Sequence, residues 1–279
     1  MNTSFSIENT LKQTLQTFKQ NIGLMLYMGI VYTGYLCTIS FFSIILKPIP
    51  TNIGDIILTE VISQLINSII TSVIYIGIFK ICLNLFRKQP IKISDLFSQI
   101  KKLGNFFVAN ILCALIVIPG LILFIVPGLI ILTTFIFFIP TIIDKNYNPI
   151  KALDFSKKLS QGNKSKLFFL LIIVFFGVGI FMLPFFILYF LILTKQGGLT
   201  EIALMDPKIS ALYAQILYIP GIVITPFVAL LITKTYLILL EIWEQKQKLN
   251  FQQNSSISNP EEIKQDYSVE TPEETEQFK

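Results

Sequence analysis

Four polar side chains inside an otherwise apolar stretch are the candidates for a binding surface in this chain. Gln64, Ser68, Thr71 and Tyr75 are spaced i, i+4, i+7 and i+11, which places them on one face of a helix. Polar side chains in an apolar helix turn away from lipid and toward neighbouring helices. The pattern therefore predicts hydrogen bonds between helices, with a polar cavity or a ligand path as the alternative.

Two lysines, Lys80 and Lys234, also lie inside apolar stretches. Ionisable residues within a membrane span are candidates for function. Each lysine precedes a charged residue, Arg87 or Glu241, by about two helical turns, so its long side chain can reach the membrane surface. We expect contact with lipid headgroups, and a role in substrate binding is the alternative.

The side chain that enzymes use most often for acid–base chemistry is missing. The chain has no histidine, which excludes Ser-His and Cys-His pairs and H-E-x-x-H metal sites. Cys37, Cys82 and Cys113 lie far apart in apolar stretches, so we expect them to be packing residues. No Asp or Glu lies deep in such a stretch, and Asp144 and Asp154 are expected to pair with cations near helix ends. The sequence predicts a protein that is not an enzyme and needs no metal or cofactor.

Long apolar segments must position these residues. Of the 279 residues, 53% are hydrophobic and 14% are charged, and the mean hydropathy is +0.69, whereas soluble domains are about 25% charged. A spanning helix needs about 20 apolar residues, and residues 1–245 contain six such segments, at about 22–46, 61–86, two within 103–143, 167–193 and 209–240. We therefore expect an all-α polytopic membrane protein with six transmembrane helices. Residues 246–279 are polar and acidic, which predicts a disordered tail.

Short amphipathic segments are expected at the membrane surface. Ser6 can cap a first helix, whose apolar face consists of Leu11, Leu15, Phe18 and Ile22. Ser94 is expected to cap a second. A third is expected from Pro149, preceded by Asn148, to Gly162 or Asn163.

Residues 103–143 carry no charged side chain and predict two helices in a hairpin. Pro119-Gly120 and Pro127-Gly128 bracket its turn, and the residues between them are all apolar, so we expect the turn inside the apolar zone of the membrane. We place it at residues 126–128, with a kink at Pro119 and the fourth helix ending near Pro140. A third Pro-Gly pair, Pro220-Gly221, is expected to break the sixth helix.

The charge distribution predicts orientation. With six spans, 17 Lys and Arg residues fall on the side of the termini and 3 on the other, which places both termini in the cytoplasm. The basic residues sit in short loops between apolar segments, which argues against nucleic acid binding.

The chain resembles a family of bacterial inner-membrane proteins. The order Pro127-Gly128, residues 138–144, Pro149 to Leu153, Ser156 and Gly162-Asn163 is similar to the YciC-type family, related to the membrane domain of some glycerophosphodiester phosphodiesterases. This resemblance implies a bacterial inner (plasma) membrane protein of six spans without established activity. It does not imply phosphodiesterase chemistry, which belongs to a separate domain in those enzymes.

Together these patterns predict a non-enzymatic membrane protein that organises or regulates its surroundings. Its expected partners are membrane lipids, including anionic headgroups attracted to the basic loops, or another membrane protein. The alternative is a transporter or channel for a small or lipid-like solute, favoured by the polar face at Gln64–Tyr75 and by helices broken at Pro-Gly pairs.

Overall fold

The computed structural model describes residues 5–46, 53–195 and 215–257, and these residues form helices without strands. Six segments are long and apolar enough to cross a membrane, so the expected all-α class is confirmed. The elements are α1 Ile7–Gln20, α2 Ile22–Leu46, α3 Ile53–Phe86, η1 Ile93–Leu96, η2 Ile100–Lys102, α4 Leu103–Leu123, α5 Ile125–Phe135, α6 Phe138–Lys145, α7 Pro149–Ser160, α8 Lys164–Lys195, η3 Gln215–Tyr218 and α11 Gly221–Ile257.

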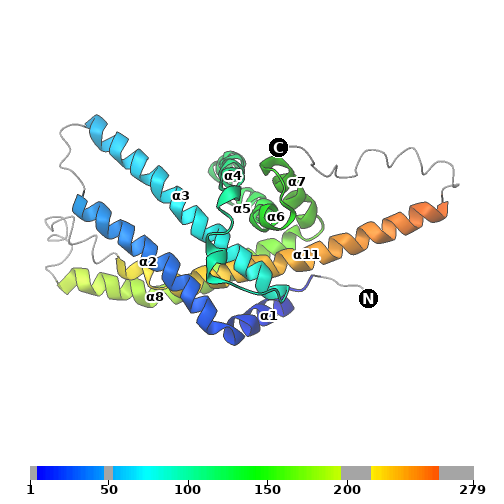
Figure 1. The fold of residues 1–279 in the computed structure, drawn as a ribbon, viewed down its shortest axis with the longest axis horizontal. Coiled ribbons are helices and arrows are strands. Elements are labelled where there is room, and N and C mark those ends of the chain that lie inside the picture. The colour runs from blue at the N-terminus through cyan, green and yellow to red at the C-terminus, as the bar shows by residue number, and fades with distance from the viewer. Residues whose placement is uncertain (1–4, 47–52, 196–214, 258–279) are drawn as a thin grey trace.

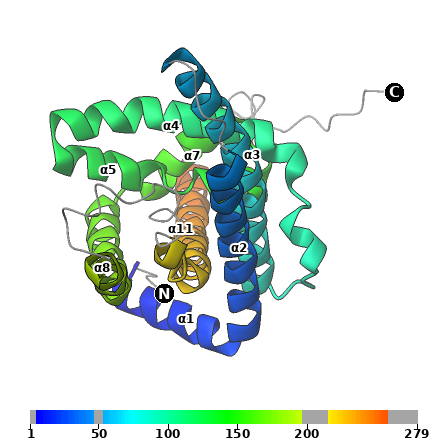
Figure 2. The same ribbon diagram turned by 90° about the vertical axis from the view of Figure 1, so that its left-hand side faces the viewer.

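Helices α2 and α3 run side by side and obliquely to α8 and α11, and a hairpin crosses both pairs. In Figure 1, α2, α3, α8 and α11 are seen along their length, whereas α4 is seen end-on. In Figure 2, turned by 90°, α8 and α11 are seen end-on and α4 and α5 along their length. Helix α11 is central, because it packs against α1, α2, α3 and α7.

Helix α1 begins as predicted, but it buries a different face. The Ser6 side chain accepts a hydrogen bond from the Asn9 N–H. The buried residues are Thr10, Thr14 and Phe18, whereas Leu15 is exposed. Both threonine hydroxyls donate to carbonyls of their own helix, so these small residues can pack closely, as at helix contacts in membranes.

The helix expected after Ser94 is absent from the structure, and that prediction was wrong. Two 3-10 turns, η1 and η2, lead into α4, and Asp95 accepts a hydrogen bond from the Lys92 N–H. The backbone of Leu96 lies directly against Gly77 of α3, where a Cβ atom would collide with it. This contact between distant residues shapes the segment. The third amphipathic helix is confirmed as α7, with Asn148 accepting from the Lys151 N–H and Gly162 at φ +80° beyond its end.

The hairpin turn lies at Phe124, not at residues 126–128 as predicted. Phe124 has an extended backbone (φ −154°, ψ 126°) and is the one residue between α4 and α5. Pro119 lies inside α4. Pro127 and Gly128 belong to the first turn of α5, where backbone N–H groups have no partner within the helix and proline therefore removes none.

The fourth span also differs from the prediction that it ends near Pro140. It consists of α5, a break at residues 136–137 and then α6, in whose first turn Pro140 lies. A proline is tolerated there for the same reason.

The last helix is longer than expected. The break at Pro220-Gly221 is confirmed, because η3 ends at Tyr218 and α11 begins at Gly221. Helix α11 then continues to Ile257, so residues 246–257 are helical where a disordered tail was predicted. Extending a formed helix costs far less than starting one. The rest of that tail, 258–279, and the start of the sixth predicted span, 209–214, lie outside the described residues.

Candidate functional site

Two adjoining cavities share a wall of α3, the larger lying between α2, α3, α4 and α11 and the smaller between α2, α3 and η3. Their volumes are about 700 Å³ and about 420 Å³. The polar face predicted from sequence lines them: Ser68, Thr71 and Tyr75 border the larger cavity, and Gln64, Ser68 and Thr71 border the smaller. The structure thus brings these four residues to a cavity wall, the arrangement that the sequence analysis held as its alternative.

The lining combines two chemistries, without a charged residue. Neutral polar groups of Tyr32, Ser68, Thr71, Ser72, Tyr75, Asn110 and Thr225 face the larger cavity. Phe106, Phe107, Ile111, Ala114, Ile224 and Val228 supply its apolar surface. Some polar groups are already paired locally, since Ser72 donates to the Ser68 carbonyl at 2.6 Å. Such a wall suits a neutral amphiphile better than an ion.

The two intramembrane lysines lie away from this cavity lining. Lys234 Nζ sits 5.2 Å from the centroid of the Phe86 ring, a cation–π contact. Lys80 is half-buried on α3. Contact of either lysine with lipid headgroups stays a prediction.

The predicted Pro-Gly positions are sites of close helix approach. A Cβ atom on Gly120 would lie 3.3 Å from the Gly128 Cα atom, and one on Gly128 would lie 2.6 Å from the Leu121 backbone nitrogen. The glycines therefore allow α4 and α5 to pack backbone against backbone. At the start of α11, a Cβ atom on Gly221 would lie 3.2 Å from Thr33 Oγ1.

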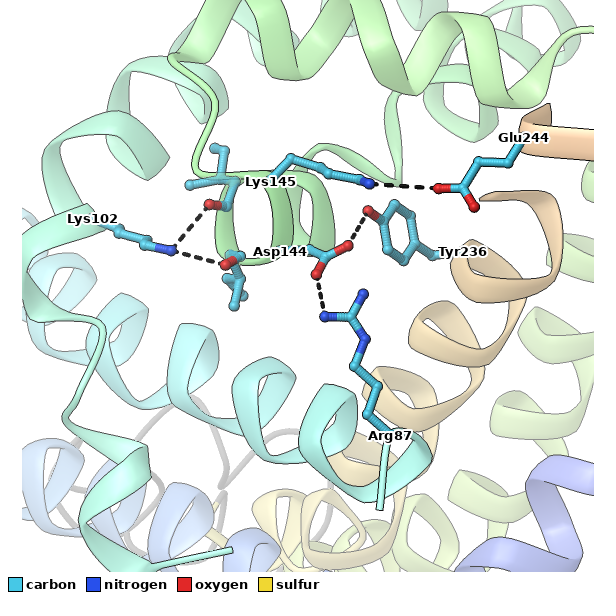
Figure 3. A network of polar contacts seen from close by, with 8 residues as sticks. Arg87, Lys102, Asp144, Lys145, Tyr236 and Glu244 are labelled. Carbon is cyan, nitrogen blue, oxygen red and sulfur yellow. Dashed lines mark hydrogen bonds and ion pairs between the residues drawn. The ribbon is translucent and has the colours of Figure 1, made fainter. Parts of the chain in front are cut away.

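An ionic network around the buried Asp144 links the ends of α3 and α6 to the middle of α11 (Figure 3). Asp144, at the end of α6, pairs with Arg87 just after α3 and accepts a hydrogen bond of 2.8 Å from the Tyr236 hydroxyl of α11. The Asp144 side chain is 3% exposed. Because both carboxylate oxygens are engaged, Asp144 acts as a structural anchor and not as a free base.

Two more lysines complete this region of the structure. Lys102 Nζ donates to the carbonyls of Ile143 at 2.8 Å and Ile142 at 3.4 Å in the last turn of α6. Such carbonyls lack partners within their own helix. Lys145 Nζ lies 3.6 Å from Glu244 of α11. The network therefore ties η2, α3, α6 and α11 together.

The sequence predicted Asp144 as an ion-pair partner but missed its burial and its partners. One signal was present. Arg87 is the only arginine in the chain, among 22 basic residues. A planar guanidinium matches a carboxylate better than an ammonium does, so an isolated arginine in a lysine-rich chain points to such a pair.

Two serines of α7 form hydrogen bonds with backbone groups that are left without helical partners at the break between α5 and α6. The Phe137 N–H donates to Ser156 Oγ at 3.2 Å, and the hydroxyls of Ser156 and Ser160 donate to the Thr134 carbonyl at 2.9 and 3.0 Å. Backbone groups freed inside an apolar region need such partners. From the sequence, Ser156 was noted only as part of a family motif, and no role was predicted for Ser160.

The described residues include no group of three or more His, Cys, Asp or Glu that could hold a metal ion. Cys82 and Cys113 are buried, and Cys37 is half-buried.

These helices define a polytopic α-helical membrane protein. The chain belongs to the family described as "Domain of unknown function (DUF7847)", whose model matches residues 57–239. That segment contains Arg87, Asp144 and Tyr236 and most of the cavity lining. No curated protein and no solved structure matches the chain. The resemblance to YciC-type proteins stays a prediction.

Proposed function

We propose that this protein is a non-enzymatic membrane protein that binds a lipid between α2, α3, α4 and α11 and so organises or regulates its membrane surroundings. The observation that carries this proposal is the uncharged lining of the cavity of about 700 Å³, which is mainly apolar and includes neutral hydroxyl and amide groups. That volume lies within the range of about 300–1,000 Å³ of small-molecule pockets.

The lining indicates which part of a lipid would bind. Hydroxyl and amide groups on α3 and α4 can pair with ester or hydroxyl oxygens of a glycerol backbone. The aromatic and aliphatic residues of α4 and α11 offer contact to acyl chains. An anionic headgroup would instead meet the basic loops at residues 87–102 and 144–166.

The proposal includes the setting of the protein. We place it in a bacterial inner membrane with both termini in the cytoplasm, because the basic loops and the termini fall on one side of the predicted topology. The arrangement of the helices is consistent with this topology. In Figure 1, α1, α7 and the last turns of α11 all lie to the right of the left-hand ends of α2, α3 and α8. A protein partner would meet this basic face.

Filling the cavity tests the proposal. Ala114→Phe adds a ring to the cavity wall, whereas Leu115→Phe changes a neighbouring residue of α4 that is 66% exposed and outside the lining. Native mass spectrometry of protein extracted in mild detergent should show bound lipid in the wild type and in Leu115→Phe. We expect about tenfold lower occupancy in Ala114→Phe, equivalent to about 1.4 kcal/mol. Equal occupancy in all three proteins would contradict binding in this cavity.

Solute transport is the second candidate, favoured by one observation. The two cavities share Ser68, Thr71 and Ser72, so a polar strip follows α3 from Gln64 to Tyr75. This strip covers about 16 Å of helix, roughly half the hydrocarbon thickness. If it is a solute path, Gln64→Leu and Thr71→Val should abolish flux in liposomes. Unchanged flux in both variants would remove the strip from any path.

A further inference from the structure

The most exposed apolar surface in the described residues is the tip of the α4–α5 hairpin. Ile122, Leu123, Phe124 and Ile125 are 70–78% exposed, and Val126 is 55% exposed. Residues 118–128 contain no polar side chain. Moving one large apolar side chain from a nonpolar medium into water costs about 1.5–3 kcal/mol, so this tip is not suited to an aqueous loop.

The hairpin is a rigid unit. Its two helices pack backbone against backbone at Gly120 and Gly128, and the one residue Phe124 connects them. The Phe124 N–H donates to the Gly120 carbonyl, and the Gly128 N–H donates to the Phe124 carbonyl. Both backbone groups of the connecting residue Phe124 are therefore paired without water, as favoured inside a bilayer.

Helix α5 alone is too short for a crossing, and it reaches the 21 residues of a candidate span only together with α6, beyond the break at residues 136–137. Its 11 residues give about 16 Å of helix, whereas the hydrocarbon core is about 30 Å thick. At the other end, α5 stops at Phe135, and Ser156 of α7 accepts a hydrogen bond from the Phe137 N–H just beyond it. Lys102 of η2, just before α4, donates to the Ile143 carbonyl of α6. These contacts hold the base of the hairpin against its neighbours.

The direction of the hairpin also argues against a crossing of the membrane. Helix α4 is end-on in Figure 1, where α8 and α11 run lengthwise, and it runs lengthwise in Figure 2, where they are end-on. If α8 and α11 follow the membrane normal, the hairpin lies close to the membrane plane. Its depth is inside the apolar zone, because Phe106 and Asn110 line the cavity with Thr225 and Val228 of α11.

We propose that the α4–α5 hairpin does not cross the membrane but lies within the leaflet on the side of α1 and α7, with its tip at Phe124 among lipid acyl chains. The occupant of this exposed surface is hydrocarbon. The hairpin then acts as a wedge that adds volume to one leaflet. This inference concerns placement in the bilayer and does not depend on lipid binding in the cavity.

Cysteine labelling and depth-dependent quenching test this placement in a background in which Cys37, Cys82 and Cys113 are replaced by alanine, so that only the introduced thiol reacts. Phe124→Cys and, as a second variant, Ile122→Cys are compared with Gln161→Cys, an exposed position at the end of α7. In vesicles, a membrane-impermeant maleimide should label Gln161→Cys and neither tip variant, from either side. A membrane-soluble bimane attached at the tip should be quenched several-fold more by lipids brominated along the acyl chain than by lipids labelled at the headgroup.

Two outcomes would overturn the proposal. Labelling of a tip variant by impermeant maleimide from the side opposite Gln161 would show that the hairpin crosses. Absence of quenching by any brominated lipid would show that protein, such as a second copy, covers the tip. Loss of cavity lipid in Ala114→Phe leaves both readouts unchanged, so the two proposals fail separately.

Discussion

Replacing Arg87 with alanine is expected to destabilise the protein by about 3 kcal/mol or more, because the buried Asp144 carboxylate loses its charged partner. The Tyr236 hydroxyl would be its one remaining partner in the network. Arg87→Lys should recover only part of the loss, since an ammonium cannot reproduce the planar fork of a guanidinium. Thermal unfolding in detergent measures the effect, and the single tryptophan reports it locally, because Trp243 packs on Phe155 at 5.2 Å between ring centroids.

A double variant and a surface pair serve as controls for this experiment. Arg87→Ala combined with Asp144→Asn should be more stable than Arg87→Ala alone, because no unpaired charge stays buried. The Lys158–Asp154 pair is 3.1 Å long and about half-exposed on both sides. Lys158→Ala should therefore cost about 0.5 kcal/mol or less. A similar loss for Arg87→Ala and Lys158→Ala would mean that Asp144 is not held as the structure shows.

Gly29→Ala is expected to separate α2 from α11, with a loss of about 3 kcal/mol, the upper end of typical overpacking penalties. A Cβ atom at Gly29 would collide with the backbone carbonyl of Ile222, in the first turn of α11. A backbone atom cannot rotate away as a side chain can, so the two helices must move apart. Unfolding midpoints in detergent, compared with the wild type, measure the loss.

Helix α2 provides a matched control. Gly34 has no atom within 4 Å of an added Cβ atom, and alanine favours helix by about 1 kcal/mol relative to glycine. Gly34→Ala should therefore be neutral or stabilising. If Gly29→Ala proves as stable as Gly34→Ala, the close approach of α2 to α11 is not present in the protein.

Local patterns predicted the elements better than their junctions. The first predicted span, residues 22–46, coincides with α2, because an apolar run bounded by Asn21 and Pro48 is a property of the local sequence. The cap at Ser6 and the start at Asn148-Pro149 were found for the same reason. The form of η1 was missed, because it depends on packing of Leu96 against Gly77.

The candidate sites show the same limit of the sequence. Spacing alone placed Gln64, Ser68, Thr71 and Tyr75 on one face, but not whether another helix or a cavity met them. Asp144 lies 57 residues from Arg87 and 92 from Tyr236. Periodicity within one helix carries no information about contacts at that separation. The single arginine was the one local signal of the network.

The length of α11 determines how far its C-terminal end at Ile257 stands from the basic loops. The Lys145–Glu244 contact marks the level of the basic loops, and from Glu244 to Ile257 the helix rises about 20 Å further. In Figure 1 this part projects past the other described helices. Charges separated by more than about 8 Å of physiological saline are largely screened from each other. The end of α11 at Ile257 therefore lies beyond the electrostatic reach of the lysine-rich surface at the level of Lys145.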